Sequence, residues 1–463
     1  MDSQQSKIDR LSALLGRVDG PEAVLGGETI SKLSERITTP FYWYNGDVVA
    51  AQVQRVRAAL GEHASVVYSV KANPSLALCQ IIAGQGIGCE VASIGELLLA
   101  ERAGFPVDRI MFIGPGKTDD ELMAAIDMGI EAIIVESPGE IRRIARMAKE
   151  RRTRMRIGIR INVSAQVKGY GMRMGGGAQQ FGIDEELLPE VIAEHRDDAN
   201  VEICGVQVYA GSQQFDIDAL LAHCHHVIDL GLSVADMLGR PLEFIDLGGG
   251  FGVPYFENTQ EFDLDAFSEG FESVVSRCRS DHRLAGAHVV IELGRYLVAQ
   301  AGLYVMRAVD VKTTHGKTFV VTDGGMNHHI AGTGNFGQVF RKPFPIAVLN
   351  RMNAEKVWDT AVVGPNCTPL DTFAQNLSMP IVEAGDLLGV YYSGAYGYSA
   401  SSLGFLSHPT PAEVLFWNGE THMLRKPGRP DAVLQGQAGL PEADVDRLVK
   451  VTGKASPQQA VAD

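Results

Sequence analysis

The chain has 463 residues, and its 41 lysines and arginines against 56 aspartates and glutamates give a formal net charge of −15. This acidic balance argues against a nucleic acid or an anionic membrane surface as the main partner. There is no apolar run long enough for a membrane span and no signal-peptide pattern at the start, and the six cysteines are scattered without a C-x-x-C pair. We therefore expect a cytoplasmic protein without a disulfide framework and without a metal site.

Eight short apolar runs follow one another, with helix-like stretches between them. The first four runs begin 21 or 22 residues apart, at Val66, Gly88, Arg109 and Glu131. The later four begin at Arg156, Ile203, Phe244 and Val289. Continuous apolar runs are typical of parallel strands that are buried on both faces. Eight such units predict a (β/α)8 barrel over residues 41–300, with a doubly wound sheet as the alternative.

The pattern changes after about Gly302. Residues 301–435 contain apolar runs joined by short polar turns such as HGK and NGE, which predict an antiparallel β domain. We expect residues 1–40 to pack on that domain. Residues 436–463 are polar and proline-containing, and we expect them to form a flexible tail. The fold class is thus α/β, a barrel followed by a β domain.

Chemically distinctive residues stand at the carboxyl ends of the predicted barrel strands, where barrel enzymes place their active sites. Lys71 ends the first strand, Gly248–Gly252 the seventh, and Glu292 and Arg295 the eighth. Each of these features, taken alone, has an ordinary structural explanation: Lys71 would be a lysine at the rim of the barrel, the glycine run a tight turn, and Glu292 with Arg295 an ion pair. Together, a lysine for an aldehyde, glycines and an arginine for a phosphate, and a carboxylate for a ring nitrogen indicate pyridoxal 5'-phosphate. A nicotinamide cofactor is disfavoured because the glycine run does not match G-x-G-x-x-G.

Six sequence blocks carry a family resemblance. They are YSVKANP (68–74), EVASIGEL (90–97), DLGGGFG (246–252), ELGRYLV (292–298), GPNCTPLD (364–371) and SGAYGYS (393–399). In content and order they resemble the fold-type III pyridoxal-phosphate decarboxylases. These include ornithine, diaminopimelate and arginine decarboxylases and share their barrel with alanine racemase. The resemblance covers about residues 38–420 and implies an amino acid carboxy-lyase.

The resemblance also implies roles for individual residues around the cofactor. Lys71 corresponds to the lysine that binds the cofactor aldehyde, Glu90 to a carboxylate near it, and Glu292 to the partner of the pyridine nitrogen. Arg160 corresponds to a residue beneath the cofactor. The residues that correspond to phosphate binders are Ser212, Gly249, Gly250, Arg295 and Tyr396.

Cys367 corresponds to the catalytic cysteine of the family, which protonates the substrate Cα after carbon dioxide leaves. The resemblance implies that this cysteine reaches the active site from the second subunit, so an obligate homodimer with shared sites is expected. A racemase would place an arginine near the ring nitrogen, and a non-catalytic relative would be expected to lack Lys71 or Cys367. Both remain the weaker alternatives.

Two positions depart from the ornithine and diaminopimelate decarboxylase pattern. Tyr209 stands where those enzymes stack a histidine on the cofactor ring, and Thr368 replaces the acidic residue that holds the distal ammonium of the substrate. A neutral threonine removes the anchor of a diamine precursor, and an unpaired ammonium in a closed site is costly. Free diaminopimelate, ornithine or lysine is therefore the alternative substrate rather than the expected one.

The chain resembles one subgroup of the family more than it resembles the ornithine and diaminopimelate decarboxylases. This subgroup includes L-glutamyl-acyl-carrier-protein, siderophore-intermediate and exosortase-associated decarboxylases. The matching blocks are GMRMGGGAQQFGID (171–184), TDGGMNHH (322–329), GNFGQVFRKPFP (334–345) and LSHPTPAE (406–413). This resemblance predicts an amino-acid conjugate as substrate and allows an acyl carrier protein as partner. Arg341, Thr368 and Asp371 are the expected substrate contacts. The glycine-rich loop at 171–177 is expected to be flexible or to close as a lid.

Overall fold

The computed structural model describes residues 4–163, 172–173, 177–336 and 342–452. A closed ring of eight parallel strands forms the centre of the barrel, because β8 pairs with β9 and β15 pairs with β5. The ring consists of β5 (Ser65–Ser69), β6 (Gly88–Val91), β7 (Ile110–Phe112), β8 (Ala132–Val135), β9 (Met155–Asn162), β12 (Val201–Gln207), β14 (Phe244–Gly249) and β15 (His288–Leu293). The expected (β/α)8 barrel is confirmed.

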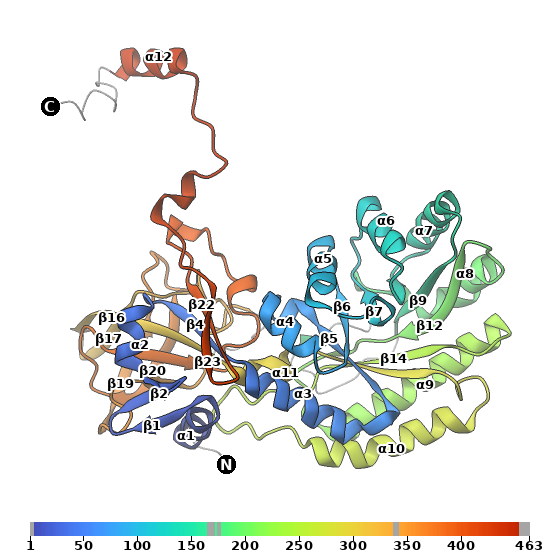
Figure 1. The fold of residues 1–463 in the computed structure, drawn as a ribbon, viewed down its shortest axis with the longest axis horizontal. Coiled ribbons are helices and arrows are strands. Elements are labelled where there is room, and N and C mark those ends of the chain that lie inside the picture. The colour runs from blue at the N-terminus through green and yellow to red at the C-terminus, as the bar shows by residue number, and fades with distance from the viewer. Residues whose placement is uncertain (1–3, 164–171, 174–176, 337–341, 453–463) are drawn as a thin grey trace.

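Helices surround this ring (Figure 1). They are α3 (Gly46–Leu60), α4 (Leu76–Ala83), α5 (Ile94–Ala103), α6 (Asp119–Met128), α7 (Pro138–Arg151), α8 (Leu188–His195), α9 (Ile217–Leu238), α10 (Leu264–Ser280) and the short α11 (Arg295–Val298). Capping side chains begin several of them just after a strand. Ser93 and Ser137 accept hydrogen bonds from the backbone N–H groups of Glu96 and Glu140, and Thr118 forms a capping box. These caps fix where each strand-to-helix loop ends.

The β domain is a mixed, mostly antiparallel sheet in the order β20-β19-β17-β16-β4-β22-β23, with β21 paired to β16 and β18 paired to β21. Its strands are β4 (Phe41–Asn45), β16 (Gly302–Thr314), β17 (Lys317–Thr322), β18 (Ile346–Val348), β19 (Lys356–Val363), β20 (Thr372–Pro380), β21 (Leu387–Tyr391), β22 (Ala412–Trp417) and β23 (Glu420–Arg425). Two neighbouring pairs, β17 with β19 and β4 with β22, are parallel.

Strand β4 does not belong to the barrel, although the barrel was expected to begin at residue 41. The expected barrel range starts at residue 41, yet all five residues of β4 are buried in the sheet of the β domain. Phe41 pairs with Val305 of β16 on one side and with Ala412 of β22 on the other. The apolar sequence Phe-Tyr-Trp-Tyr predicts a buried strand, but its partners come from the far end of the chain.

The N-terminal segment lies against the same sheet. It contains α1 (Gln4–Leu15), β1 (Arg17–Asp19), β2 (Glu22–Leu25), β3 (Glu28–Thr29) and α2 (Ile30–Arg36). Backbone hydrogen bonds of 2.7 Å join Ala23 to Leu349 and Pro21 to Met352. At the other end of the chain, α12 (Glu442–Thr452) lies apart from both the barrel and the sheet (Figure 1).

One continuous apolar core runs from the N-terminal segment through the outer layer of the barrel into the β domain. A second, smaller cluster fills the inside of the barrel; it consists of Val67, Met111, Ile113, Ala132, Ile134, Cys204, Phe244 and Val290. The barrel is therefore packed rather than hollow, and polar chemistry is confined to its two ends. All six cysteines are free thiols, and only Cys367 is exposed.

Candidate active site

Lys71 lies at the carboxyl end of β5, beside Glu90 at the same end of the neighbouring β6. Register places Ser69 opposite Glu90, and the Lys71 Nζ donates to the Glu90 Oε1 over 2.9 Å. The lysine side chain is 41% exposed at the barrel mouth, whereas the glutamate side chain is 2% exposed. Burial lowers the pKa of Lys71, but the groups around it, Glu90 foremost, together outweigh burial and raise the pKa above its ordinary value. The pair is an ion pair in this state of the protein.

Three polar side chains lie together inside the barrel end, on β12, β14 and β15. The Gln207 Nε2 donates to the Glu292 Oε1, and the Asp246 carboxyl group lies next to Glu292. Burial and the facing Asp246 raise the pKa of Glu292 well above its ordinary value, and burial raises that of Asp246 to about 7. Two carboxyl groups in such a site hold a proton between them unless a cation is present. The Asp246 Oδ2 and the Gln207 Oε1 have no hydrogen-bond partner in the described part of the chain.

A bend of three glycines ends β14. Gly248 and Gly250 have φ of +66° and +87°, a region that side chains other than glycine rarely adopt. A Cβ atom on Gly249 would collide with the backbone oxygen of Glu292, and one on Gly250 with that of Gly211. Gly211 and Ser212 form β13, which therefore lies against the glycine bend. We call Gly248–Gly250 the glycine cradle, because the lack of side chains allows backbone N–H groups of this bend to approach an anion.

Arg295 is the first residue of α11 and lies between two tyrosine rings near this bend. Its guanidinium carbon is 4.9 Å from the ring centroid of Tyr396 and 5.7 Å from that of Tyr255. The Tyr396 backbone N–H donates to the carbonyl of Ala72, directly beside Lys71. The Arg295 Nε is buried without a partner among the described residues, so a donor is available to an anion.

Arg160 and Tyr209 lie on the same end of the barrel. The Arg160 guanidinium pairs with Glu136 at 3.0 Å and stacks over the ring of Phe181 at 4.6 Å. Both contacts hold the arginine in place at the end of β9. Tyr209 follows β12, is half-buried, and has its pKa raised to about 12 by burial, with Lys71 opposing that effect. Its phenol therefore stays neutral at physiological pH.

Cys367 lies on the loop between β19 and β20 of the β domain and is exposed. In the described part of the chain it makes no hydrogen bond to the Lys71 group. Asp371 on the same loop is 2% exposed and accepts from the backbone N–H groups of Met326 and Asn366 and from the Asn366 Nδ2. Asp371 thus joins this loop to the one after β17, while Thr368 is half-buried and its carbonyl accepts from the Asp371 N–H. Arg341 and most of the 171–177 loop lie outside the described residues.

Five polar residues at this end of the barrel were not predicted from the sequence: Gln207, Asp246, Glu136, Lys117 and Glu140. Lys117 is buried and donates to Glu140 at 2.8 Å and to the carbonyls of Gly114 and Ile134. For Gln207, Asp246 and Glu136, the signal in the sequence was a polar residue within or just after an apolar strand. A single such residue is ambiguous until the register of the neighbouring strands is known.

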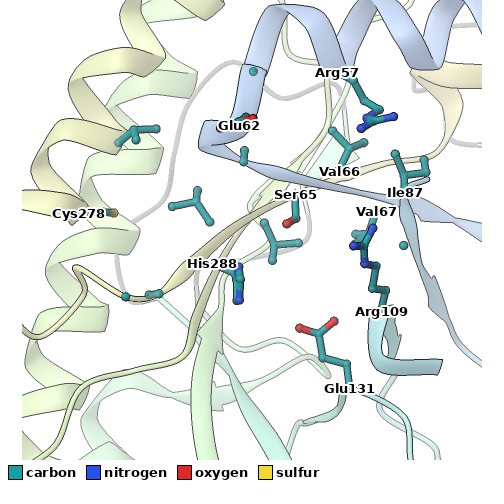
Figure 2. Close-up of a pocket in the computed structure, with 18 of the residues that line it drawn as sticks. Arg57, Glu62, Ser65, Val66, Val67, Ile87, Arg109, Glu131, Cys278 and His288 are labelled. Carbon is teal, nitrogen blue, oxygen red and sulfur yellow. The ribbon is translucent and has the colours of Figure 1, made fainter. Parts of the chain in front are cut away.

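A cavity of about 600 Å³ lies at the opposite, amino-terminal end of the barrel, around the first residues of β5, β6 and β15. Figure 2 shows Arg109, Glu131 and His288 turned into it. Burial raises the pKa of Glu131 to about 7. Nearby, Glu202, Cys204 and Glu243 come together, but Arg154, Arg156 and Arg240 pair with the two carboxylates. This end is far from the carboxyl ends of the strands, where Lys71 and Glu292 lie, and it is not the candidate active site.

Comparison with known proteins agrees with this geometry. Residues 46–299 match the family model described as "Pyridoxal-dependent decarboxylase, pyridoxal binding domain". The chain belongs to this family. It is therefore a pyridoxal-phosphate-dependent amino acid decarboxylase. The unpartnered Arg295 Nε, the glycine cradle and the buried Glu292 fit the phosphate and the ring nitrogen of that cofactor.

Three relatives place the chain within the family. It is 37% identical over 414 residues to an L-glutamyl-[BtrI acyl-carrier protein] decarboxylase from Niallia circulans, covering 88% of this chain and 96% of the relative. It is 30% identical over 389 residues to a 2-[(L-alanin-3-ylcarbamoyl)methyl]-2-hydroxybutanedioate decarboxylase from Staphylococcus aureus, covering 80% and 93%. The solved diaminopimelate decarboxylase from Helicobacter pylori, complexed with L-lysine, matches with a TM-score of 0.79 at 28% identity, covering 88% and 98%.

Over the described ranges, no helix combines the length and the apolar character that a bilayer span requires.

Proposed function

We propose that this enzyme decarboxylates an L-amino acid that is part of a larger conjugate, such as an aminoacyl group on a carrier protein. The observation that carries the proposal is Thr368, a neutral residue directly after Cys367, where a diamine precursor needs a carboxylate. The names of two relatives support it, because each describes an amino acid joined to a larger group. Diaminopimelate, ornithine or lysine in free form is the second candidate, supported by the likeness to a diaminopimelate decarboxylase.

The chain's own residues have separate tasks in this proposal. Lys71 would hold the cofactor through its aldehyde, and Glu90 orients the lysine by accepting a hydrogen bond from its Nζ. Glu292, which accepts from Gln207 and faces Asp246, would hold the proton on the pyridine nitrogen. The phosphate would be held by Gly249, Gly250, Ser212, Arg295 and Tyr396. The cofactor ring would lie against Tyr209 and Arg160. Pyridoxal phosphate, when bound, supplies an electron sink for the pair left as carbon dioxide departs.

The remaining step needs a proton on the substrate Cα, and we assign it to the Cys367 Sγ of a second subunit. Cys367 is exposed on its own chain, and large apolar side chains near it are exposed as well; Phe336 is 39% exposed and Leu370 43%. The Asn335 Nδ2 donates to the Leu370 carbonyl, so these two segments lie side by side. An exposed apolar face around a reactive thiol supports a homodimer in which each subunit completes the other's site.

The substrate proposal is tested by measuring carbon dioxide release from matched substrates. We expect turnover of an L-glutamyl thioester on a carrier protein or on pantetheine, with kcat/KM at least a hundredfold above that for free glutamate, ornithine, lysine, arginine or diaminopimelate. Lys71→Ala is the inactive control. Efficient turnover of one of the free amino acids would exclude the conjugate. Release from a conjugate other than the glutamyl thioester would support the substrate class and correct the amino acid.

A further inference from the structure

The first helix of the chain, α1, is hydrogen-bonded to the loop that follows the glycine cradle. Lys7 on α1 is 0% exposed. Its Nζ donates to the carbonyl oxygens of Pro254 at 3.0 Å, Phe256 at 2.5 Å and Thr259 at 2.6 Å. An ammonium group has three protons, and three carbonyls of a single loop accept them. A buried lysine is expensive unless it is satisfied in this way, so the contact is specific.

The loop that Lys7 binds contains Tyr255, and the ring of Tyr255 packs against the side chain of Arg295. Pro254 and Phe256, whose carbonyls Lys7 holds, are the two neighbours of Tyr255 in the chain. The Tyr255 side chain is 3% exposed, and its ring centroid lies 5.7 Å from the guanidinium carbon of Arg295. Arg295 is the arginine with the unpartnered Nε beside the glycine cradle. Lys7 therefore fixes the backbone on both sides of the residue that orients the phosphate-binding arginine.

A second residue of α1 reaches the same tyrosine by another route. Arg10, one turn after Lys7, donates to the Tyr392 hydroxyl at 2.8 Å and pairs with Glu261 of the same loop. The Tyr392 ring centroid is 5.4 Å from that of Tyr255. Residues three apart on a helix share a face, so one face of α1 supports Tyr255 through its backbone and through its ring.

We propose that α1 is part of the cofactor's phosphate site and that Lys7 is a positioning residue for Arg295, acting through Tyr255. Donors to a phosphate are effective when they are held in place before the anion arrives. Without Lys7, the buried carbonyl of Pro254 and the partly buried carbonyls of Phe256 and Thr259 lose their donor, and the loop around Tyr255 shifts toward solvent. Arg295 then loses its fixed position while every residue that touches the phosphate is still present.

The experiment compares cofactor binding in Lys7→Met, which keeps the length of the side chain but removes its donors, with Lys32→Met. Lys32 is an exposed lysine of α2 in the same N-terminal segment. Apo-protein is titrated with pyridoxal phosphate, followed by absorbance, and the ³¹P chemical shift of the bound cofactor is recorded. We expect Lys7→Met to bind the cofactor at least tenfold more weakly with a changed ³¹P shift, Lys32→Met to match the wild type, and Lys7→Arg to recover part of the affinity.

The affinity of the protein for the cofactor does not depend on which substrate the enzyme uses. The thermal midpoint of each apo-protein separates loss of folding from loss of binding. A Lys7→Met protein that is less stable but binds the cofactor with the wild-type Kd and ³¹P shift would give Lys7 a purely structural role and overturn the proposal. If Lys7→Met does not fold, Lys7→Arg and Arg10→Met decide: wild-type cofactor affinity in both would overturn it.

Discussion

Glu131 shows how one side chain can limit stability at the end of the barrel that does no chemistry. Its pKa is raised by burial from 4.5 to about 7, so the folded state holds the proton more tightly than the unfolded state does. The resulting penalty is absent below about pH 4.5, grows as the pH rises toward 7, and is complete above that pH. The carboxylate therefore lowers the free energy of unfolding at neutral and alkaline pH.

Glu131→Gln should remove this penalty. We expect the variant to exceed the wild type in the free energy of unfolding by up to about 3 kcal/mol at pH 8 and to equal it near pH 4. Urea unfolding at a series of pH values measures the difference. Glu62→Gln, which removes a negative charge from the exposed rim of the same cavity, is the matched control. A gain for Glu131→Gln that does not change with pH would contradict the role of its titration.

At the scale of the element, Asp371 holds the Cys367 loop to the loop after β17. Asn366 also donates to the Asn327 Oδ1, and Cβ atoms on Gly325 or Gly364 would collide with the Asp371 carboxylate. Two glycines and one carboxylate therefore set the path of the loop. Asp371 was expected to touch the substrate, and that role stays a prediction; the contacts favour a role in positioning Cys367.

Asp371→Asn places an NH₂ group where two N–H donors point, so we expect the free energy of unfolding to fall by about 2 kcal/mol. Since the loop carries Cys367, kcat should fall more than cofactor affinity. Denaturant unfolding and steady-state kinetics test both parts, with Glu355→Gln on an exposed turn as the control. Loss of stability with an unchanged kcat would limit Asp371 to a structural role.

The barrel strands could be predicted from sequence because strands buried on both faces are apolar throughout. Each predicted run begins within two residues of an observed strand, for example Val66 against Ser65 and Ile203 against Val201. The partners of β4 could not be predicted, since they lie more than 250 residues away in the chain. For the same reason Asp246 and Gln207 were missed. Their importance arises only when register brings them to Glu292, whereas Lys71, Glu90 and Glu292 were named from motifs.

At the scale of the whole molecule, the position of Cys367 predicts that two inactive variants complement one another. Lys71→Ala and Cys367→Ala proteins, dissociated together and reassociated, should recover roughly one quarter of the wild-type activity. The reason is that half of the dimers are hybrids and each hybrid has one intact site. Each variant treated alone is the control. Hybrids detected by native mass spectrometry without any recovered activity would place the cysteine and the lysine of one site on the same chain.

The central position of β4 in the β domain has a consequence for how the protein is made. This strand leaves the ribosome early, yet β16 and β22, its two neighbours, follow only after the whole barrel has been synthesised. Its buried aromatic side chains must stay unpaired through that interval, which is a period of exposure to aggregation. Because β4 lies in the middle of the sheet, the β domain cannot be expressed as a separate, contiguous fragment. A fragment beginning at residue 301 lacks the strand that joins the two halves of its sheet, and a barrel fragment that keeps residue 41 carries an orphaned strand.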